Sequence, residues 1–130
     1  MSDIPANLLY SEEHEYVMET DEESVYNVGI TDYAQGELGD IVYVEMPSVG
    51  DTFQRGDVFG TVEAVKAVRD RFAPVSGEIV AINEALDADP SLVNGDPYGE
   101  GWMIKVRISD PSELESLLSA EGYASHIGED

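Results

Sequence analysis

The stretch Val58-Phe-Gly-Thr-Val-Glu-Ala-Val-Lys66-Ala-Val-Arg-Asp-Arg-Phe-Ala-Pro-Val-Ser-Gly77 decides the fold that this sequence predicts. Two segments rich in β-branched and aromatic residues, 60–64 and 69–73, flank the short run 65–67. This pattern predicts a β-hairpin with Lys66 at its tip and its long side chain in water. A lysine in that position can carry a covalently attached group, although a lysine at a turn is usually ordinary solvated surface.

Lys66 calls for an explanation because the chain contains only two lysines. The other, Lys105, follows 39 residues later in segment 102–108. That segment alternates with a period of two, which predicts a strand with one set of side chains outward and the other inward. The outward set is Met103, Lys105 and Arg107, and the inward set is Trp102, Ile104, Val106 and Ile108. Only Lys66 is therefore expected at a tip.

An internal repeat relates two parts of the chain. Residues 39–44 resemble residues 77–82 at an offset of 38, and residues 56–60 resemble residues 95–99 at an offset of 39. Two copies cannot form a solenoid, so the repeat predicts one domain over residues 1–130 with two quasi-symmetric halves. Chance similarity between Gly-Asp turns is the alternative.

Short strands separated by turn residues are predicted through most of the chain. Besides the hairpin, they are expected at residues 16–18, 24–30, 41–44, 77–82 and 102–108, with the acidic run 19–23 as the turn between the first two. The fold class is therefore mainly β, a flattened antiparallel β-barrel or sandwich of two quasi-symmetric halves with short flanking helices.

Three short helical segments are expected. Thr31-Asp32 is predicted to cap a helix over 33–38, and Asn83 one over 84–87. Ser109-Asp110 before Pro111 opens a C-terminal helical segment, 109–130, packed on the domain. Its inward residues are expected to be Leu114, Leu117 and Leu118, with Gly122 ending or breaking the helix and residues 123–130 adding a further turn.

The composition excludes several classes of function. The chain has 130 residues, 42% of them hydrophobic, and its 28 acidic and 6 basic residues give a net charge of −22, which repels nucleic acids and anionic membranes. It has no cysteine, so disulfides and thiolate metal sites are excluded. No apolar run approaches the roughly 18 residues that span a bilayer, and the first ten residues lack signal-peptide features, so a cytoplasmic location is expected.

The acidic residues are typical of a surface adapted to concentrated salt, where screening weakens their mutual repulsion. We predict that folding weakens at low ionic strength, because repulsion then reaches about 30 Å at 0.01 M salt instead of about 3 Å at 1 M. The denaturant midpoint should rise between those salt concentrations, and an unchanged midpoint would contradict the prediction. The basic residues are not spread evenly: Arg55, Lys66, Arg69 and Arg71 lie in one segment.

Many ordered segments resemble the H protein of the glycine cleavage system, a lipoyl-carrying family related to the lipoyl domains of 2-oxoacid dehydrogenases. These segments are residues 10–16 (YSEEHEY), 29–35 (GITDYAQ), 38–42 (LGDIV), 63–67 (EAVKA), 74–78 (PVSGE), Val93-Asn94, Pro97-Tyr98 and Gly101-Trp102. The chain departs from the family pattern at Ala64, usually Ser, at Tyr16, usually Trp, and at Val68-Arg69, where small or polar residues are usual. Arg69 and Arg71 are expected to influence which enzymes dock.

The resemblance implies a barrel-sandwich hybrid fold and a non-catalytic carrier with lipoic acid joined to Lys66 by an amide, within a motif that includes Glu63 and Ala67. It implies a cleft that protects the aminomethyl-loaded arm, with Glu15 and Asp70 as carboxylates and Tyr33 as a weaker candidate. The alternative is that Glu15 and Asp70 are ordinary solvated surface acids, which would not protect the arm. The implied partners are glycine decarboxylase (P protein), aminomethyltransferase (T protein), dihydrolipoyl dehydrogenase (L protein) and a lipoylating enzyme. The carrier is expected to be a monomer.

Other readings of the lysine hairpin stay open or are disfavoured by particular residues. Val65 and Ala67 argue against a biotin carrier, whose lysine is typically flanked by methionines. The His14-Glu15 pair and the 98–102 segment argue against a separate lipoyl domain of a dehydrogenase. A carrier devoted to lipoyl delivery to other enzymes remains an alternative, as does a purely structural acidic domain. No metal site is expected, because Leu92 and Tyr98 break the calcium-loop pattern that starts at Asp87.

Overall fold

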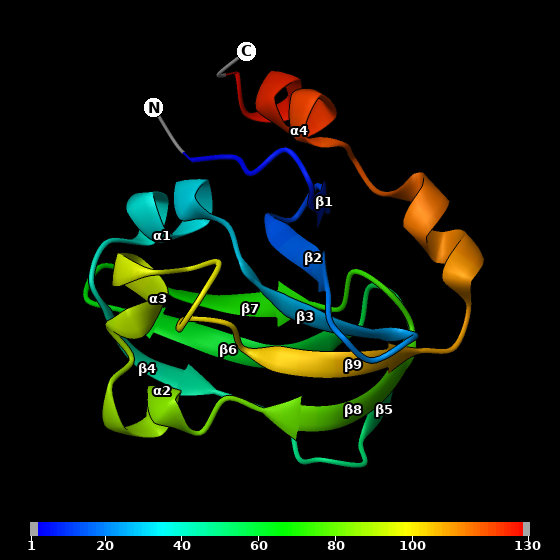
Figure 1. Ribbon diagram of the computed structural model, residues 1–130. Coiled ribbons are helices and arrows are strands. Elements are labelled where there is room, and N and C mark those ends of the chain that lie inside the picture. The colour runs from blue at the N-terminus through cyan, green and yellow to red at the C-terminus, as the bar shows by residue number, and fades with distance from the viewer. Residues whose placement is uncertain (1–2, 129–130) are drawn as a thin grey trace.

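Two antiparallel sheets face each other across the core of the computed structural model, which describes residues 3–128 (Figure 1). The larger sheet has the strand order β1-β2-β3-β9-β8-β5, and the smaller has the order β4-β6-β7. The strands are β1 (Leu9–Tyr10), β2 (Glu15–Glu19), β3 (Val25–Ile30), β4 (Ile41–Glu45), β5 (Thr52–Phe53), β6 (Val58–Ala64), β7 (Val68–Phe72), β8 (Gly77–Ile82) and β9 (Ile104–Ile108). The expectation of a mainly β sandwich is confirmed. The predicted range 1–130 also includes residues 1–2 and 129–130, which lie outside the described residues.

The core lies between the sheets because their strands alternate inward and outward side chains. In β6, Phe59, Val62 and Ala64 are buried, whereas Glu63 is exposed. Both sheets contribute to a single large cluster, for example Val28 and Ile79 from the larger sheet. A second cluster, at the N-terminal edge, consists of Leu8, Tyr10, Tyr16 and Tyr123.

Only the first predicted repeat block coincides with strands in both halves: residues 39–44 include most of β4 and residues 77–82 form β8, whereas residues 56–60 enter β6 but residues 95–99 lie at the end of α3 and in the turns before β9. In the first half β4 pairs with β6, and in the second β8 pairs with β9, each with a register shift. The connections differ: the first contains β5, and the second contains the short helices α2 (Ala85–Ala88) and α3 (Leu92–Gly95). Helix α3 was not predicted from the sequence, because a single helical turn is too short to show a period of 3.6 residues.

One of the two predicted helix caps is confirmed; at the second helix the N-cap residue is Glu84, which makes no side-chain cap hydrogen bond, and α2 covers residues 85–88 instead of 84–87. Thr31 caps α1 (Asp32–Leu38), its hydroxyl oxygen accepting a hydrogen bond of 3.2 Å from the N–H of Ala34. The side-chain oxygen of Asn83 accepts one of 3.2 Å from the N–H of Ala85, at the start of α2. The cap of α1 matters for the site below, because it fixes the helix beside the predicted lysine hairpin.

The C-terminal segment differs from its prediction. Residues 111–116 form a 3₁₀ helix, η1 (Pro111–Ser116), the chain then runs extended through Leu118, and α4 (Ala120–Ile127) begins after Ser119. The expectation that Gly122 ends the helix was wrong. Gly122 lies in the first turn of α4, where its N–H donates to the Ser119 hydroxyl, and the terminating glycine is Gly128 with φ of +80°.

The start of β9 also differs from its prediction. Met103 was expected to face outward and Trp102 inward, but Met103 is fully buried and Trp102 is partly exposed. The strand begins only at Ile104, so the alternation does not extend to the two preceding residues. Trp102 instead lies under Lys105, whose ammonium nitrogen is 5.2 Å from the ring centroid.

Gly77 gives a test of the packing between β8 and β9. A β-carbon at Gly77 would overlap the carbonyl oxygen of Arg107 on the paired strand. We expect Gly77→Ala to lower the free energy of unfolding by about 2–4 kcal/mol, measured by denaturant titration. Gly36→Ala is the matched control, because nothing lies within 4 Å of that position in α1, and it should raise stability by about 0.5–1 kcal/mol. Equal effects at both positions would contradict the close approach at Gly77.

None of the helices within residues 3–128 is both long and apolar enough to cross a bilayer.

Candidate functional site

The β6–β7 hairpin holds Lys66 at an exposed tip, as the sequence predicted. The N–H of Ala64 donates to the carbonyl of Ala67 at 2.8 Å, which closes the turn. The N–H of Val65 donates to the carbonyl of Asp40 at 3.1 Å, which ties the tip to the loop before β4. The stem of Lys66 passes over Gly39, where a β-carbon would lie 3.9 Å from the lysine Cδ atom. The backbone of the tip is thus held in place, while the Lys66 side chain remains exposed.

The surface around the tip combines apolar and acidic side chains. Glu63 is exposed and lies in register with Tyr43 on one side and Val68 on the other. Tyr43 and Val68 are at least half exposed, and Val65, next to Lys66, is 73% exposed. Ala67, by contrast, is partly buried and packs against the core. Exposed apolar side chains gathered around one lysine are typical of a surface that contacts other proteins.

A hollow of about 330 Å³ lies beside the hairpin, between β7 and α1. Its lining mixes apolar, aromatic and charged side chains: His14, Tyr33, Ala34, Glu37, Leu38, Ala67, Arg69 and Arg71. A second hollow of about 330 Å³ lies further along β7 and is lined by residues that include Glu15, Phe72, Ala73 and Pro74. The first contains one of the predicted cleft residues, Tyr33, and the second contains another, Glu15.

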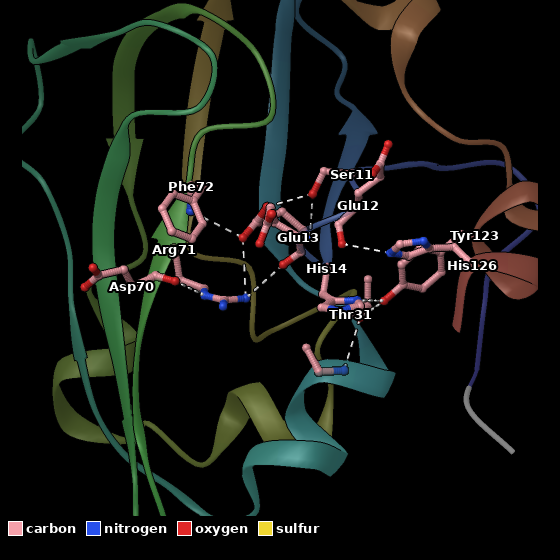
Figure 2. A network of polar contacts seen from close by, with 12 residues as sticks. Ser11, Glu12, Glu13, His14, Thr31, Asp70, Arg71, Phe72, Tyr123 and His126 are labelled. Atoms are coloured by element: carbon pink, nitrogen blue, oxygen red, sulfur yellow. Dashed lines mark hydrogen bonds and ion pairs between the residues drawn. The ribbon is translucent and has the colours of Figure 1, made fainter. Parts of the chain in front are cut away.

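Glu15 and Arg71 form a buried ion pair between the two hollows. The Arg71 Nη1 atom lies 3.4 Å from Glu15 Oε2, and the two side chains are 8% and 0% exposed. Arg71 also donates to two backbone carbonyls, those of Asp70 at 2.9 Å and Glu13 at 3.3 Å. Figure 2 shows Arg71 extending from β7 toward Glu13, in the turn just before β2. The pair therefore joins the edge of the smaller sheet to the larger sheet.

Each carboxylate oxygen of Glu15 has a further donor. The Ser11 hydroxyl donates to Oε1 at 2.7 Å, and the Phe72 N–H donates to Oε2 at 3.3 Å. Burial nevertheless raises the pKa of Glu15 to about 7, because the loss of water outweighs the stabilisation of the anion by Arg71, Ser11 and Phe72. Glu15 is therefore not one of the solvated acidic side chains of the surface.

The other two predicted cleft residues lie in different places. Tyr33 forms part of the wall of the first hollow, with its ring centroid 5.2 Å from that of His14. Asp70 is exposed, and its carboxylate lies 3.5 Å from the Thr61 hydroxyl on the outer face of the smaller sheet. Its side chain lines neither of the two hollows. Tyr33 and Glu15 therefore lie in the walls of the first and the second hollow along β7, which together we call the groove, and the Asp70 side chain lies outside both.

A polar network behind the first hollow was missed by the sequence reasoning. The Tyr123 hydroxyl is hydrogen-bonded both to His14 Nδ1 at 2.9 Å and to the Thr31 hydroxyl at 2.7 Å (Figure 2). The His126 Nε2 atom lies 3.0 Å from the carbonyl oxygen of Glu12. Burial, together with the nearby His126 and Arg71, lowers the pKa of His14, so its ring is neutral at pH 7. The network connects α4, α1 and the start of β2, and so fixes the back wall of the hollow.

The signals for this network are present in the sequence but are weak. Tyr123 is an aromatic residue in a short helix, which is equally consistent with ordinary packing. His14 takes a φ of 74°, a left-handed conformation that the sequence did not indicate. Within residues 3–128, no group of three or more His, Asp or Glu side chains is placed to hold a metal ion.

Comparison with known proteins gives a consistent result. Residues 8–130 match the family model described as glycine cleavage H-protein. The chain is 52% identical over 130 residues to the glycine cleavage system H protein of Shewanella oneidensis, covering 100% of both chains. It is 54% identical over 127 residues to that of Bacillus cereus, covering 98% of both.

A solved structure extends the agreement to the fold. The crystal structure of a glycine cleavage system H protein from Mycobacterium marinum superposes with a TM-score of 0.87 at 38% sequence identity, covering 96% of this chain and 99% of that one. The family model, the relatives and the solved structure all indicate the same family. This chain belongs to the glycine cleavage H-protein family.

Proposed function

We propose that this protein is the lipoyl-carrying shuttle of the glycine cleavage system, a carrier without catalytic activity of its own. The observation that carries the proposal is the exposed Lys66 at the tip of the β6–β7 hairpin, beside a groove, in a chain of this family. When bound, lipoic acid supplies a strained S–S bond that opens as the aminomethyl group of glycine is taken up. The chain's own residues present, orient and shelter the arm.

The groove fits an arm attached at Lys66. Arg71 lies five residues further along the extended β7. At about 3.3 Å per residue, this is roughly 16 Å from Lys66. A lysine lengthened by an acyl chain of about eight carbons has a similar reach, roughly 15 Å. The first part of the path is lined by Leu38 and Ala67, which suit a hydrocarbon chain, and the far part by Glu15, which suits a cation.

We assign the proposed roles residue by residue. Lys66 is the attachment site, and Glu63 and Ala67 present it to the attaching enzyme on either side of the tip. Glu15 and Tyr33 belong to the groove that holds the aminomethyl-loaded arm, where low water access slows loss of the amine. Asp70 lies on the outer face of β7, so its carboxylate is restricted to contacts with docking enzymes.

The proposed partners are the P, T and L proteins of the system and a lipoylating enzyme. All four must reach Lys66, and the exposed Tyr43, Val65 and Val68 around the tip offer them an apolar contact. Such a contact is favourable for a protein of charge −22, because apolar burial does not weaken in the concentrated salt that screens its charges.

Intact-mass analysis of the protein co-expressed with a lipoylating enzyme tests this function. We expect one lipoyl group per chain, absent from Lys66→Ala. Lys105→Ala is the matched control and should retain the modification, because Lys105 lies within β9 and over the Trp102 ring. An unmodified Lys66 in protein that supports glycine oxidation would overturn the proposal.

A further inference from the structure

Arg71 is unusual among the basic side chains of the described residues because it alone is buried. It extends from the edge strand β7 and forms part of the wall of the first hollow. Behind it lies Glu15, which is fully buried and forms part of the wall of the second hollow. An arm that follows β7 from Lys66 therefore meets the guanidinium group of Arg71 before it meets the carboxylate of Glu15.

Both carboxylate oxygens of Glu15 already have partners. One carboxylate oxygen accepts from Ser11, and the other accepts from the Phe72 N–H and lies 3.4 Å from Arg71. Ser11 and Phe72 are neutral donors that a bound amine does not need to displace. Arg71, however, is a cation, and two cations cannot share one buried carboxylate without strong repulsion.

We propose that Arg71 is a competing counter-ion: it occupies Glu15 when the arm is neutral and must move aside when a cationic amine at the end of the arm binds there. This inference rests on the proposed function. Exchange of one cation for another leaves the buried carboxylate paired throughout, so it avoids the cost of an isolated buried charge. The unloaded arm is neutral whether it is oxidised or reduced, so it offers no cation that could replace Arg71 at Glu15. The groove consequently distinguishes the loaded arm from the unloaded one.

The geometry provides a place for the displaced side chain. Apart from Glu15, the polar partners of Arg71 within residues 3–128 are the backbone carbonyls of Asp70 and Glu13, which are neutral acceptors. It borders the first hollow, whose lining also contains the exposed Glu37. A guanidinium that leaves Glu15 can therefore turn toward Glu37 and water. Competition of this kind weakens the hold on the loaded arm and favours its transfer to the next enzyme.

A pair of matched modified proteins tests the proposal. The lipoylated protein is reduced, and both thiols of the arm are alkylated with 2-bromoethylamine, which places stable cationic amines at its end. Alkylation of both thiols with 2-iodoethanol places neutral hydroxyls of similar size there. Nitrogen-15 NMR then follows the solvent exchange of the Arg71 Nε–H group, with the exposed Arg69 as internal reference. We expect the cationic arm to accelerate exchange at Arg71 by about tenfold or more, and the neutral arm to leave it unchanged.

A second measurement uses Arg71→Met, which removes the competitor but keeps the apolar stem. The cationic arm should dock more tightly in this variant, seen as about tenfold slower exchange of the arm's ammonium protons than in the wild type. Arg71→Lys, which keeps a cation, should behave like the wild type. Equal Arg71 exchange with both arms, in protein whose mass proves the modification, would overturn the inference alone. Failure of Lys66 to accept lipoic acid would instead overturn the proposed function, and the inference with it.

Discussion

Replacing Lys66 by arginine is expected to reduce glycine cleavage to the level measured with no carrier present. Arginine keeps the positive charge and the long stem, but its guanidinium group is not a substrate for amide formation with lipoic acid. Lys66 is exposed at the hairpin tip, and among residues 3–128 no hydrogen bond or ion pair that holds the turn uses its side chain. The free energy of unfolding should therefore change by no more than about 0.5 kcal/mol.

Reconstitution with the decarboxylase, the aminomethyltransferase and the dihydrolipoyl dehydrogenase provides the measurement. Glycine-dependent release of carbon dioxide is followed with wild type, Lys66→Arg and Lys105→Arg. The last variant should retain full activity, since Lys105 contributes only a contact with the Trp102 ring. Substantial activity of Lys66→Arg would place the attachment site elsewhere, and a purely structural acidic domain would show no effect of any of these changes.

The position of Lys66 could be predicted because it depends on local features. Strand-forming residues on both sides of a three-residue run determine a hairpin, and the residue in the middle is then at the tip. The same holds for the cap at Thr31, which depends on its spacing from Ala34. Features of this kind are encoded within a few neighbouring residues, so the sequence alone is sufficient.

Errors occurred where the deciding contact is distant in sequence. Met103 is buried because the strand begins only at Ile104, which depends on pairing with β3 and β8. Gly122 resembles a helix terminator, but the helix it was expected to end had already been interrupted where Leu118 pairs with Tyr10. Local propensity carries no information about either partner strand.

The buried pair is the clearest case of information that the sequence lacks. The sequence places Arg71 among the clustered bases expected to influence docking, and the family resemblance places Glu15 in the cleft, but nothing in the sequence pairs the two residues. Their contact depends on how the edge of β7 meets the start of β2, which belong to different sheets. In so acidic a chain, composition predicts that a given carboxylate is solvated. Only the packing of the two sheets shows that Glu15 is not.

Glu15→Gln is expected to change how stability depends on pH. Because the pKa of Glu15 is raised to about 7 in the folded protein, the folded state binds the proton more tightly than the unfolded state does. This contribution to stability is fully present below the unfolded pKa, about 4.3, and is lost as pH rises through about 7. Glutamine resembles the protonated carboxyl group and does not titrate. The two proteins should therefore be about equally stable at pH 4, with the variant more stable by roughly 3–4 kcal/mol at pH 8.

The difference between the two unfolding free energies is the quantity to measure, because the other acidic residues affect both proteins alike. If the attraction of Arg71 outweighed burial, the wild type would gain stability relative to the variant as pH rises, and the sign of the difference would be reversed.

Glu15→Gln also tests whether Glu15 protects the loaded arm in the groove. With no carboxylate to hold the cationic amine, Glu15→Gln should release ammonia and formaldehyde from the isolated aminomethyl-loaded protein faster than the wild type, while lipoylation of Lys66 stays complete. If the stability difference depends on pH as expected but the two proteins release ammonia and formaldehyde at equal rates, Glu15 takes no part in protecting the arm. Its role is then limited to the ion pair that joins the two sheets.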